Sequence, residues 1–150
     1  MKSAALALLI ALAASATAAA KTRSTLRVHA QANESSGPIF STTLQFLGRK
    51  VTIEKMPTVS EQDVTAVKTY RASDGTYGAL FELDQHGRLA LDSISIDRRG
   101  GRLFIFVNGR PMTEMQVDRR VSDGKIYLAS GLTANDIRLL LTDWPPRQKK

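Results

Sequence analysis

Residues 102–117 read RLFIFVNGRPMTEMQV, and this stretch decides the fold. Its first half, Leu103 to Val107, is a run of apolar strand-forming residues, which is typical of a strand buried on both faces. Asn108-Gly109 follows, and this pair suits a type I′ turn because both central positions of that turn need positive φ. The stretch therefore predicts a β-hairpin in which Arg102 to Val107 returns into Met112 to Val117.

Further strands are predicted on both sides of this hairpin. Residues 64–71 and 76–83 flank the loop Ala72-Ser73-Asp74-Gly75 and predict a second hairpin. The remaining predicted strands are residues 25–32, where Leu26, Val28 and Ala30 alternate with Arg27, His29 and Gln31; residues 39–47, with Phe40, Thr42, Leu44 and Phe46 on one side; residues 51–54; and residues 125–129.

Two modest helices complete the expected structure. Residues 84–99 hold apolar residues at Leu89, Leu91 and Ile94 and end in Gly100-Gly101, which favours a helix, although their steps of two leave a strand as an alternative. Thr133 is the predicted cap of a helix over 134–142, with Asp136 near the positive end of its dipole and Trp144-Pro145-Pro146 after its end. A single helical turn is expected at 60–63. The pattern predicts an α+β fold: an antiparallel or mixed β-sheet with two short helices packed on one face.

The N-terminus carries the features of a secretory signal peptide at residues 1–20. Lys2 gives a positive start, residues 4–14 are an apolar run rich in Ala and Leu, and cleavage is expected after Ala18 or Ala20. We therefore expect a periplasmic or secreted protein with no membrane span after cleavage. Residues 21–150 are long enough for one domain, which ends in a short basic tail.

Composition narrows the classes of function. The chain has no cysteine, which excludes disulfides and thiol redox chemistry. Its formal net charge is +7, and loss of Lys2 with the signal leaves +6. The basic clusters Arg98-Arg99, Arg119-Arg120 and residues 147–150 lie beside turns or at the terminus, so we interpret them as solvated loops, and we expect no nucleic-acid partner.

No catalytic or metal-binding constellation is recognised, and no cofactor is expected. His29, on the polar side of its predicted strand, and His86 each stand alone and are expected at the surface. Glu82 and Asp84 are interpreted as solvated carboxylates at a strand edge, and Ser130 before Gly131 as part of a turn. Phe104 and Phe106 are assigned to the core, and Trp144 is expected to cap the core.

The order of features from about Val51 to Trp144 resembles the first periplasmic (head) domain of SecD-type subunits of the bacterial protein-export machinery. The similar segments are KMPTVSEQDV (55–64), FELD (81–84), GRLFIFVNGR (101–110) and GKIYLASGLT (124–133). The chain departs from the family at Met115, where a Pro is common, and in lacking the family's membrane spans. The resemblance implies a similar fold and binding of extended polypeptide, without motor activity.

The sequence therefore favours an exported, non-enzymatic module that binds polypeptide, export-machinery subunits or other envelope proteins through an exposed sheet edge or a groove beside the helices. Two alternatives stay open at this point. One is an envelope hydrolase of unrecognised type. The other is a basic protein that binds anionic envelope polymers, for which binding would fall steeply with salt.

The predicted turn at Asn108-Gly109 is tested by Gly109→Val. Valine resists positive φ, so this substitution is expected to destabilise the domain and lower its melting temperature. An unchanged melting temperature would place the turn elsewhere.

Overall fold

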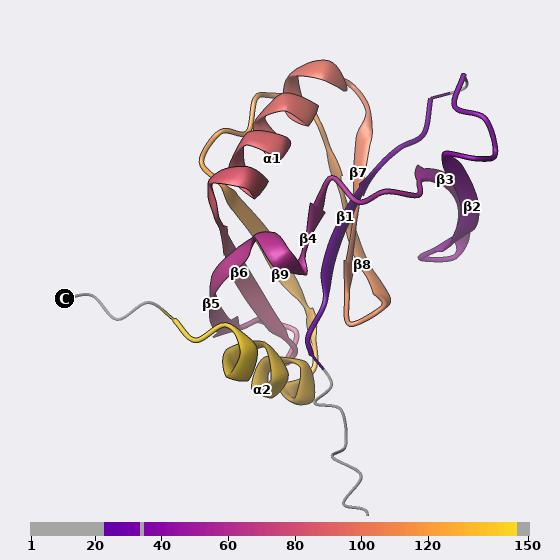
Figure 1. Cartoon of the computed structure of the whole chain (residues 1–150). Helices are drawn as coiled ribbons and strands as arrows, with labels where there is room; N and C mark the ends of the chain where they lie inside the picture. The colour runs from indigo at the N-terminus through magenta and orange to yellow at the C-terminus, as the bar shows by residue number, and fades with distance from the viewer. Residues whose placement is uncertain (1–22, 34, 147–150) are drawn as a thin grey trace, which may run out of the picture.

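The computed structural model describes residues 23–33 and 35–146 (Figure 1). The predicted signal peptide and the basic tail at 147–150 lie outside the described residues. The elements in chain order are β1 (Leu26–Ala30), β2 (Ser41–Phe46), β3 (Arg49–Glu54), β4 (Val59–Ser60), the 3-10 turn η1 (Glu61–Asp63), β5 (Val64–Arg71), β6 (Tyr77–Leu83), α1 (Gln85–Asp97), β7 (Arg102–Val107), β8 (Arg110–Gln116), β9 (Lys125–Leu132) and α2 (Ala134–Asp143).

The strands form three sheets, and their pairings are antiparallel. One sheet has the order β4-β1-β7-β8, a second is the β2-β3 pair, and the third has the order β5-β6-β9. The predicted α+β class is confirmed. Figure 1 shows the β2-β3 pair projecting from the side of β1, and we call this hairpin, residues 41–54, the arm.

The main core lies between the four-stranded and the three-stranded sheets. Both helices contribute to it, Leu91 from α1 and Leu140 from α2. Its buried side chains also come from every strand of the two larger sheets except β8: Leu26, Val28, Ala30, Val59, Val64, Val67, Ala79, Phe81, Leu103, Ile105, Val107, Ile126, Leu128 and Leu132. The predicted cap of this core is confirmed, because Trp144 packs against it.

Strand β7 is covered on both faces, as its apolar run predicts. Successive side chains of a strand point to opposite faces, so Leu103, Ile105 and Val107 enter the main core while Phe104 and Phe106 point away from it. The arm covers these two rings: the Phe46 ring lies 5.0 Å from that of Phe104 and 5.3 Å from that of Phe106. Phe104 and Phe106 therefore serve the packing of a second, smaller core.

The arm was only partly predicted. Residues 39–47 were expected to be extended throughout, but β2 begins at Ser41, and Phe40 lies in a turn whose amide donates to the Gly37 oxygen. The turn between β2 and β3 is Leu47-Gly48, with both residues at positive φ, 46° and 85°. Leucine is not a residue expected there, so the sequence did not reveal this hairpin.

The predictions for two other turns and for both helices are confirmed, although β8 begins two residues before the expected Met112. Asn108 and Gly109 have φ of 50° and 74° and join β7 to β8. The loop 72–75 joins β5 to β6, with Gly75 at φ 84°. Thr133 caps α2 in a reciprocal arrangement with Asp136, and residues 85–97 are helical, so the strand alternative for this segment is wrong.

The close packing of α1 explains its weak apolar pattern. A Cβ atom at Gly87 would lie 2.6 Å from the Asp63 Cβ, so only glycine fits where the helix crosses η1. Leu91 and Ser95 continue the buried face, whereas Leu89 and Ile96 are exposed. The steps of two in the sequence arise because two of the apolar residues lie outside the buried face.

The surface position expected for His29 is wrong. The side of β1 that carries Arg27 and His29 faces the arm, which buries the imidazole. His29 Nδ1 donates to the backbone carbonyl oxygen of Glu54 over 2.8 Å. The imidazole meets the Phe106 ring edge-on, with ring centroids 5.6 Å apart. Burial lowers the pKa of His29, the hydrogen bond to Glu54 opposes this, and the charge of Arg27 lowers it further. His29 is therefore mainly neutral in the folded domain at pH 7.

The arm is tested by Phe46→Ala. This ring is fully buried between two others, so its loss is expected to reduce the free energy of unfolding by about 3–5 kcal/mol. Denaturant melts monitored by circular dichroism measure the change. A matched control is Leu47→Ala at the exposed turn, which should leave the free energy of unfolding within about 0.5 kcal/mol of the wild-type value. Equal midpoints for Phe46→Ala and the wild type would contradict the second core.

Candidate functional site

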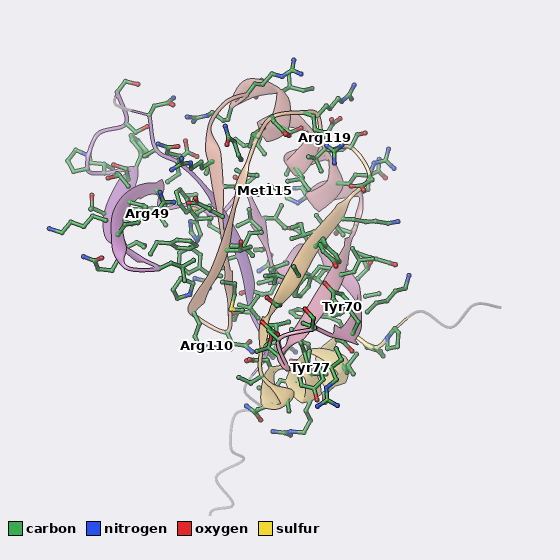
Figure 2. All side chains as sticks on the ribbon, turned by 180° about the vertical axis from the view of Figure 1, so that it is seen from behind. Arg49, Tyr70, Tyr77, Arg110, Met115 and Arg119 are labelled. Carbon is green, nitrogen blue, oxygen red and sulfur yellow. The ribbon has the colours of Figure 1, made fainter. Side chains whose placement is uncertain are left out.

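The outer edges of β8 and β9 form the candidate site. Each of these strands has one ladder neighbour among the described residues, β7 for β8 and β6 for β9. The two strands follow one another in the chain and approach each other without forming a ladder (Figure 2). We call these two outer edges the edge pair.

The backbone pattern shows which groups the edge pair offers. The Val117 amide donates to the Gly101 oxygen, so alternation directs the amides of Glu114 and Gln116 away from β7. On β9 the Leu83 amide donates to the Gly124 oxygen, which by the same alternation turns the backbone of Tyr127 away from β6. Such outward N–H and C=O groups are a template for another extended chain.

A β-bulge in β8 places two methionines beside the edge pair. Residues three apart on a regular strand point to opposite faces, yet Met112 and Met115 both pack, half-buried, against the main core. The register with β7 shifts between Ile105 and Phe106, which leaves Met112 as the extra residue of β8. Methionine side chains are unbranched and polarisable, and they adapt to varied apolar partners.

A second irregularity shapes β9. Its register with β6 shifts by two residues opposite Gly78, and Gly131 has a φ of 96°. A Cβ at Gly78 would overlap the Tyr70 ring, which crosses this position so that its hydroxyl donates to the Leu128 oxygen. The ring also stacks on Tyr127, with centroids 5.5 Å apart. Burial, followed by the hydrogen bond and charge of Tyr127, raises the pKa of Tyr70 and keeps the hydroxyl protonated as a donor.

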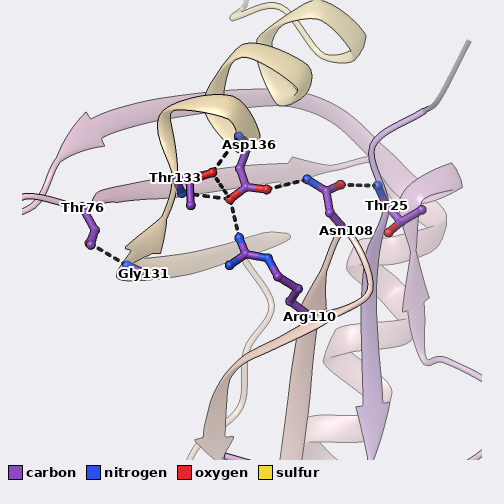
Figure 3. A network of polar contacts seen from close by, with 7 residues as sticks. All are labelled: Thr25, Thr76, Asn108, Arg110, Gly131, Thr133 and Asp136. Carbon is purple, nitrogen blue, oxygen red and sulfur yellow. Dashed lines mark hydrogen bonds and ion pairs between the residues drawn. The ribbon is translucent and has the colours of Figure 1, made fainter.

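A polar network closes one end of the edge pair (Figure 3). Its centre is Asp136 at the start of α2, whose carboxylate accepts hydrogen bonds from the Thr133 amide over 2.8 Å, from the Asn108 amide group over 2.9 Å, and from the Arg110 guanidinium. Asn108 in turn accepts from the Thr25 amide over 3.1 Å. The network ties the β7-β8 turn to α2 and to the chain leading into β1.

Asp136 is buried and ionised. Burial by itself raises the pKa of this carboxyl, but the hydrogen bonds from Thr133 and Asn108 and the charge of Arg110 outweigh burial and hold the pKa below its ordinary value. Thr133 thus has two functions: its hydroxyl caps α2, and its amide helps to keep Asp136 charged.

His86 does not stand alone as predicted. Asp63, Asp84 and His86 each place one possible ligand atom within 4.8 Å of the others. All three act in the local structure: Asp63 accepts from the Ser60 amide at 2.8 Å, Asp84 caps α1 by accepting from Gly87 at 2.8 Å, and His86 Nδ1 lies 2.7 Å from Asp63. The His86 ring is exposed, as expected, and its contact with Asp63 raises its pKa.

Other predicted surface groups have different partners from those expected. Glu82 is not at a strand edge, because β6 is the central strand of its sheet, and it pairs with Lys68 at 2.6 Å. Asp84 belongs to the cap of α1. Two arginines of the basic clusters are held in ion pairs, Arg98 with Glu54 and Arg120 with Asp92. The strand-edge position expected for Glu82 is therefore wrong, whereas Arg99, Arg119 and Arg120 lie exposed in a turn or loop, as expected.

A cavity of about 390 Å³ opens where η1, the end of α2 and the start of the described chain meet. Ser24, Glu61 and Trp144 contribute to its lining, and the Ser24 amide donates to Asp143 over 2.7 Å. The predicted site residues do not gather in this cavity. Ser130 belongs to the irregular part of β9, before Gly131.

Sequence reasoning named an exposed sheet edge or a groove beside the helices as the binding surface, but no residues for it. The available signal was Pro111, because a proline inside a strand indicates an edge or a bulge, and β8 has both. No sequence signal indicated that β9 would approach β8 without pairing with it.

Two solved structures have a similar fold. A crystal structure of SecDF in its super-membrane-facing form matches with a TM-score of 0.58 and 12% identity, over 81% of this chain and 19% of that one. A structure of SecDF, described as a membrane component that enhances protein export, matches with a TM-score of 0.56 and 15% identity, over 81% of this chain and 63% of that one. Comparison with protein-family models and with curated proteins finds no match.

The predicted resemblance to the SecD head domain is thus confirmed as a likeness of fold. The chain spans less than two thirds of the length of either structure. In residues 23–33 and 35–146, no helix has the length and apolar character needed to cross a bilayer.

The polar network is tested by Asp136→Asn. An asparagine cannot satisfy both the Thr133 amide and Arg110 as a charged acceptor does, so we expect a loss of about 1.5–3 kcal/mol in the free energy of unfolding at pH 7. A depressed carboxyl pKa contributes stability above the unfolded value near 3.8, and this is lost as pH falls through the folded value. The two proteins should therefore converge in stability towards pH 2. A constant difference from pH 7 to pH 2 would contradict the ionised state of Asp136.

Proposed function

We propose that this domain is an exported, non-enzymatic module that binds extended polypeptide by adding it as a strand at the edge pair. The observation that carries this proposal is the approach of β8 and β9 with outward backbone groups on both and no ladder between them. Backbone hydrogen bonds supply affinity that is independent of sequence, which suits a binder of many different chains.

The side chains around the edge pair fit the same role. Met112 and Met115 offer adaptable apolar contacts, and Tyr127 offers an exposed aromatic face beside the outward backbone of β9. The likeness to SecDF adds support at the level of fold, because one of those structures is described as enhancing protein export. Export-machinery subunits and unfolded envelope proteins are the partner classes that follow.

The test is a pair of variants at Gln116. Gln116→Pro removes an outward amide at the exposed end of β8 while leaving the bonds to β7, whereas Gln116→Ala keeps that amide. Binding of a fluorescently labelled polypeptide, kept unfolded by carboxymethylation, is measured by anisotropy. One hydrogen bond is worth about 1 kcal/mol, so the proline variant should bind about fivefold more weakly than the alanine variant.

Melting temperatures show that both variants are folded. Equal affinities of the two variants, or no binding by the wild type, would contradict the proposal. Binding that collapses between low and physiological salt would instead favour the anionic-polymer alternative, and cleavage of the polypeptide during incubation would favour a hydrolase.

A further inference from the structure

Exposed apolar side chains gather on the arm. Four of the seven large apolar residues exposed in the described part of the chain lie in the arm or directly beside it, with exposed fractions of 75% for Ile39, 70% for Phe40, 61% for Leu47 and 79% for Met56. The arm needs none of these four for its own packing, since Leu44, Phe46, Val51 and Ile53 make its contacts with β7. Their exposure therefore requires another explanation.

Three of the four form one patch. The Lys55 amide donates to the Phe40 oxygen over 2.8 Å, which extends the pairing of β2 and β3 beyond Ser41 and Glu54. Phe40 consequently lies beside Lys55, and Ile39 and Met56 are their immediate neighbours in the chain. The Lys55 ammonium donates to the Pro38 oxygen over 2.8 Å and so remains next to these side chains. We call Ile39, Phe40, Lys55 and Met56 the arm patch.

The exposed leucine at position 47 is held in a strained backbone conformation. It occupies a turn position with φ of 46°, where Asn108 stands in the equivalent turn of β7 and β8. An L-residue with a branched apolar side chain is disfavoured at positive φ, and asparagine or glycine would relieve this. Strain of this kind, at a residue whose side chain contributes nothing to the core, points to a use outside the fold.

The charges of the arm select the kind of partner. Glu54 is paired with Arg98, and Arg49 with Glu114. Within residues 23–33 and 35–146, Lys50 and Lys55 have no acidic partner, so the uncompensated charges of the described arm and its patch are positive. Exposed apolar side chains next to uncompensated lysines are the combination that binds an anionic lipid surface, with rings in the headgroup boundary and ammonium groups at the phosphates.

We propose that the arm patch docks the domain on a bilayer that contains anionic phospholipid. Phe40, Ile39 and Met56 insert at the headgroup boundary, and Lys55 contacts the lipid phosphates. The arm covers the face of β7 that points away from the main core, and none of the arm-patch residues belongs to β8 or β9. The proposed membrane contact and the edge pair therefore use different residues.

The test is co-sedimentation of the processed chain, residues 21–150, with vesicles. Removal of residues 1–20 is needed because an apolar leader would itself partition into lipid. Vesicles of phosphatidylethanolamine and phosphatidylglycerol, 3:1, are compared with vesicles of phosphatidylcholine. A lysine near an anionic surface strengthens binding roughly fivefold, so the anionic vesicles should bind about fivefold more protein at equal lipid.

Matched variants locate the contact. Phe40→Asp should reduce partitioning into anionic vesicles at least tenfold, whereas Leu89→Asp, the same kind of change on an exposed leucine of α1, should leave it unchanged. Lys55→Gln should remove most of the preference for phosphatidylglycerol, whereas Lys50→Gln, at the other end of the arm, should leave it unchanged. Melting temperatures of Phe40→Asp and Leu89→Asp equal to that of the wild type confirm that both are folded.

Several outcomes would overturn the proposal. These are no sedimentation of the wild type with either vesicle, equal sedimentation with both, or equal loss from Phe40→Asp and Leu89→Asp. The first, together with capture of a soluble protein that Phe40→Asp abolishes, would assign the patch to a protein partner instead. Gln116→Pro should not change vesicle binding, so failure of this proposal and failure of polypeptide binding are distinguishable.

Discussion

The apolar character of β7 on both faces is the constraint on which the rest of the structure depends. A strand with five consecutive apolar residues has to be covered twice, and this chain covers it with a main core on one face and the arm on the other. The second cover explains features that a single sheet would not have: the burial of His29 on what is nominally the polar side of β1, and the edge-on packing of Phe46 against two rings of β7.

The open edges of β8 and β9 follow from irregularities, and the Asp136 network keeps them in place. A bulge at Met112 and the two-residue shift before Gly131 disturb both strands where the Met112 side chain approaches Gly131, which breaks the alternation that a continuous ladder requires. Because Asp136 joins the β7-β8 turn to α2, the two sheets are joined there by buried polar contacts in place of a ladder. The β8 and β9 edges are thus held near each other but unpaired.

The sequence predicted what local chemistry determines. Asn108-Gly109 identified one hairpin, the 72–75 loop another, and Thr133 with Asp136 a helix start, because each signal lies within a few residues of the structure it sets. The strands of the arm were predicted but their hairpin was missed, because Leu47-Gly48 is atypical turn chemistry whose cost is met by distant packing on Phe104. The partners of His29, Glu82 and Arg98, and the residues of the edge pair, depend on contacts between distant segments, which no local pattern contains.

The arm and the edge pair are linked physically, but the direct link is weak. Arg49 on β3 pairs with Glu114 on β8, one of the residues whose amide points outward. Both side chains are a third or more exposed, and an ion pair of this kind contributes about 0–1 kcal/mol, too little to transmit a large change from one surface to the other. The stronger connection is the packing of Phe46 against β7, which positions the arm but does not reach the outer edge of β8. The arm patch and the edge pair are therefore expected to act independently. A domain docked through the arm patch remains free to bind polypeptide at the edge pair.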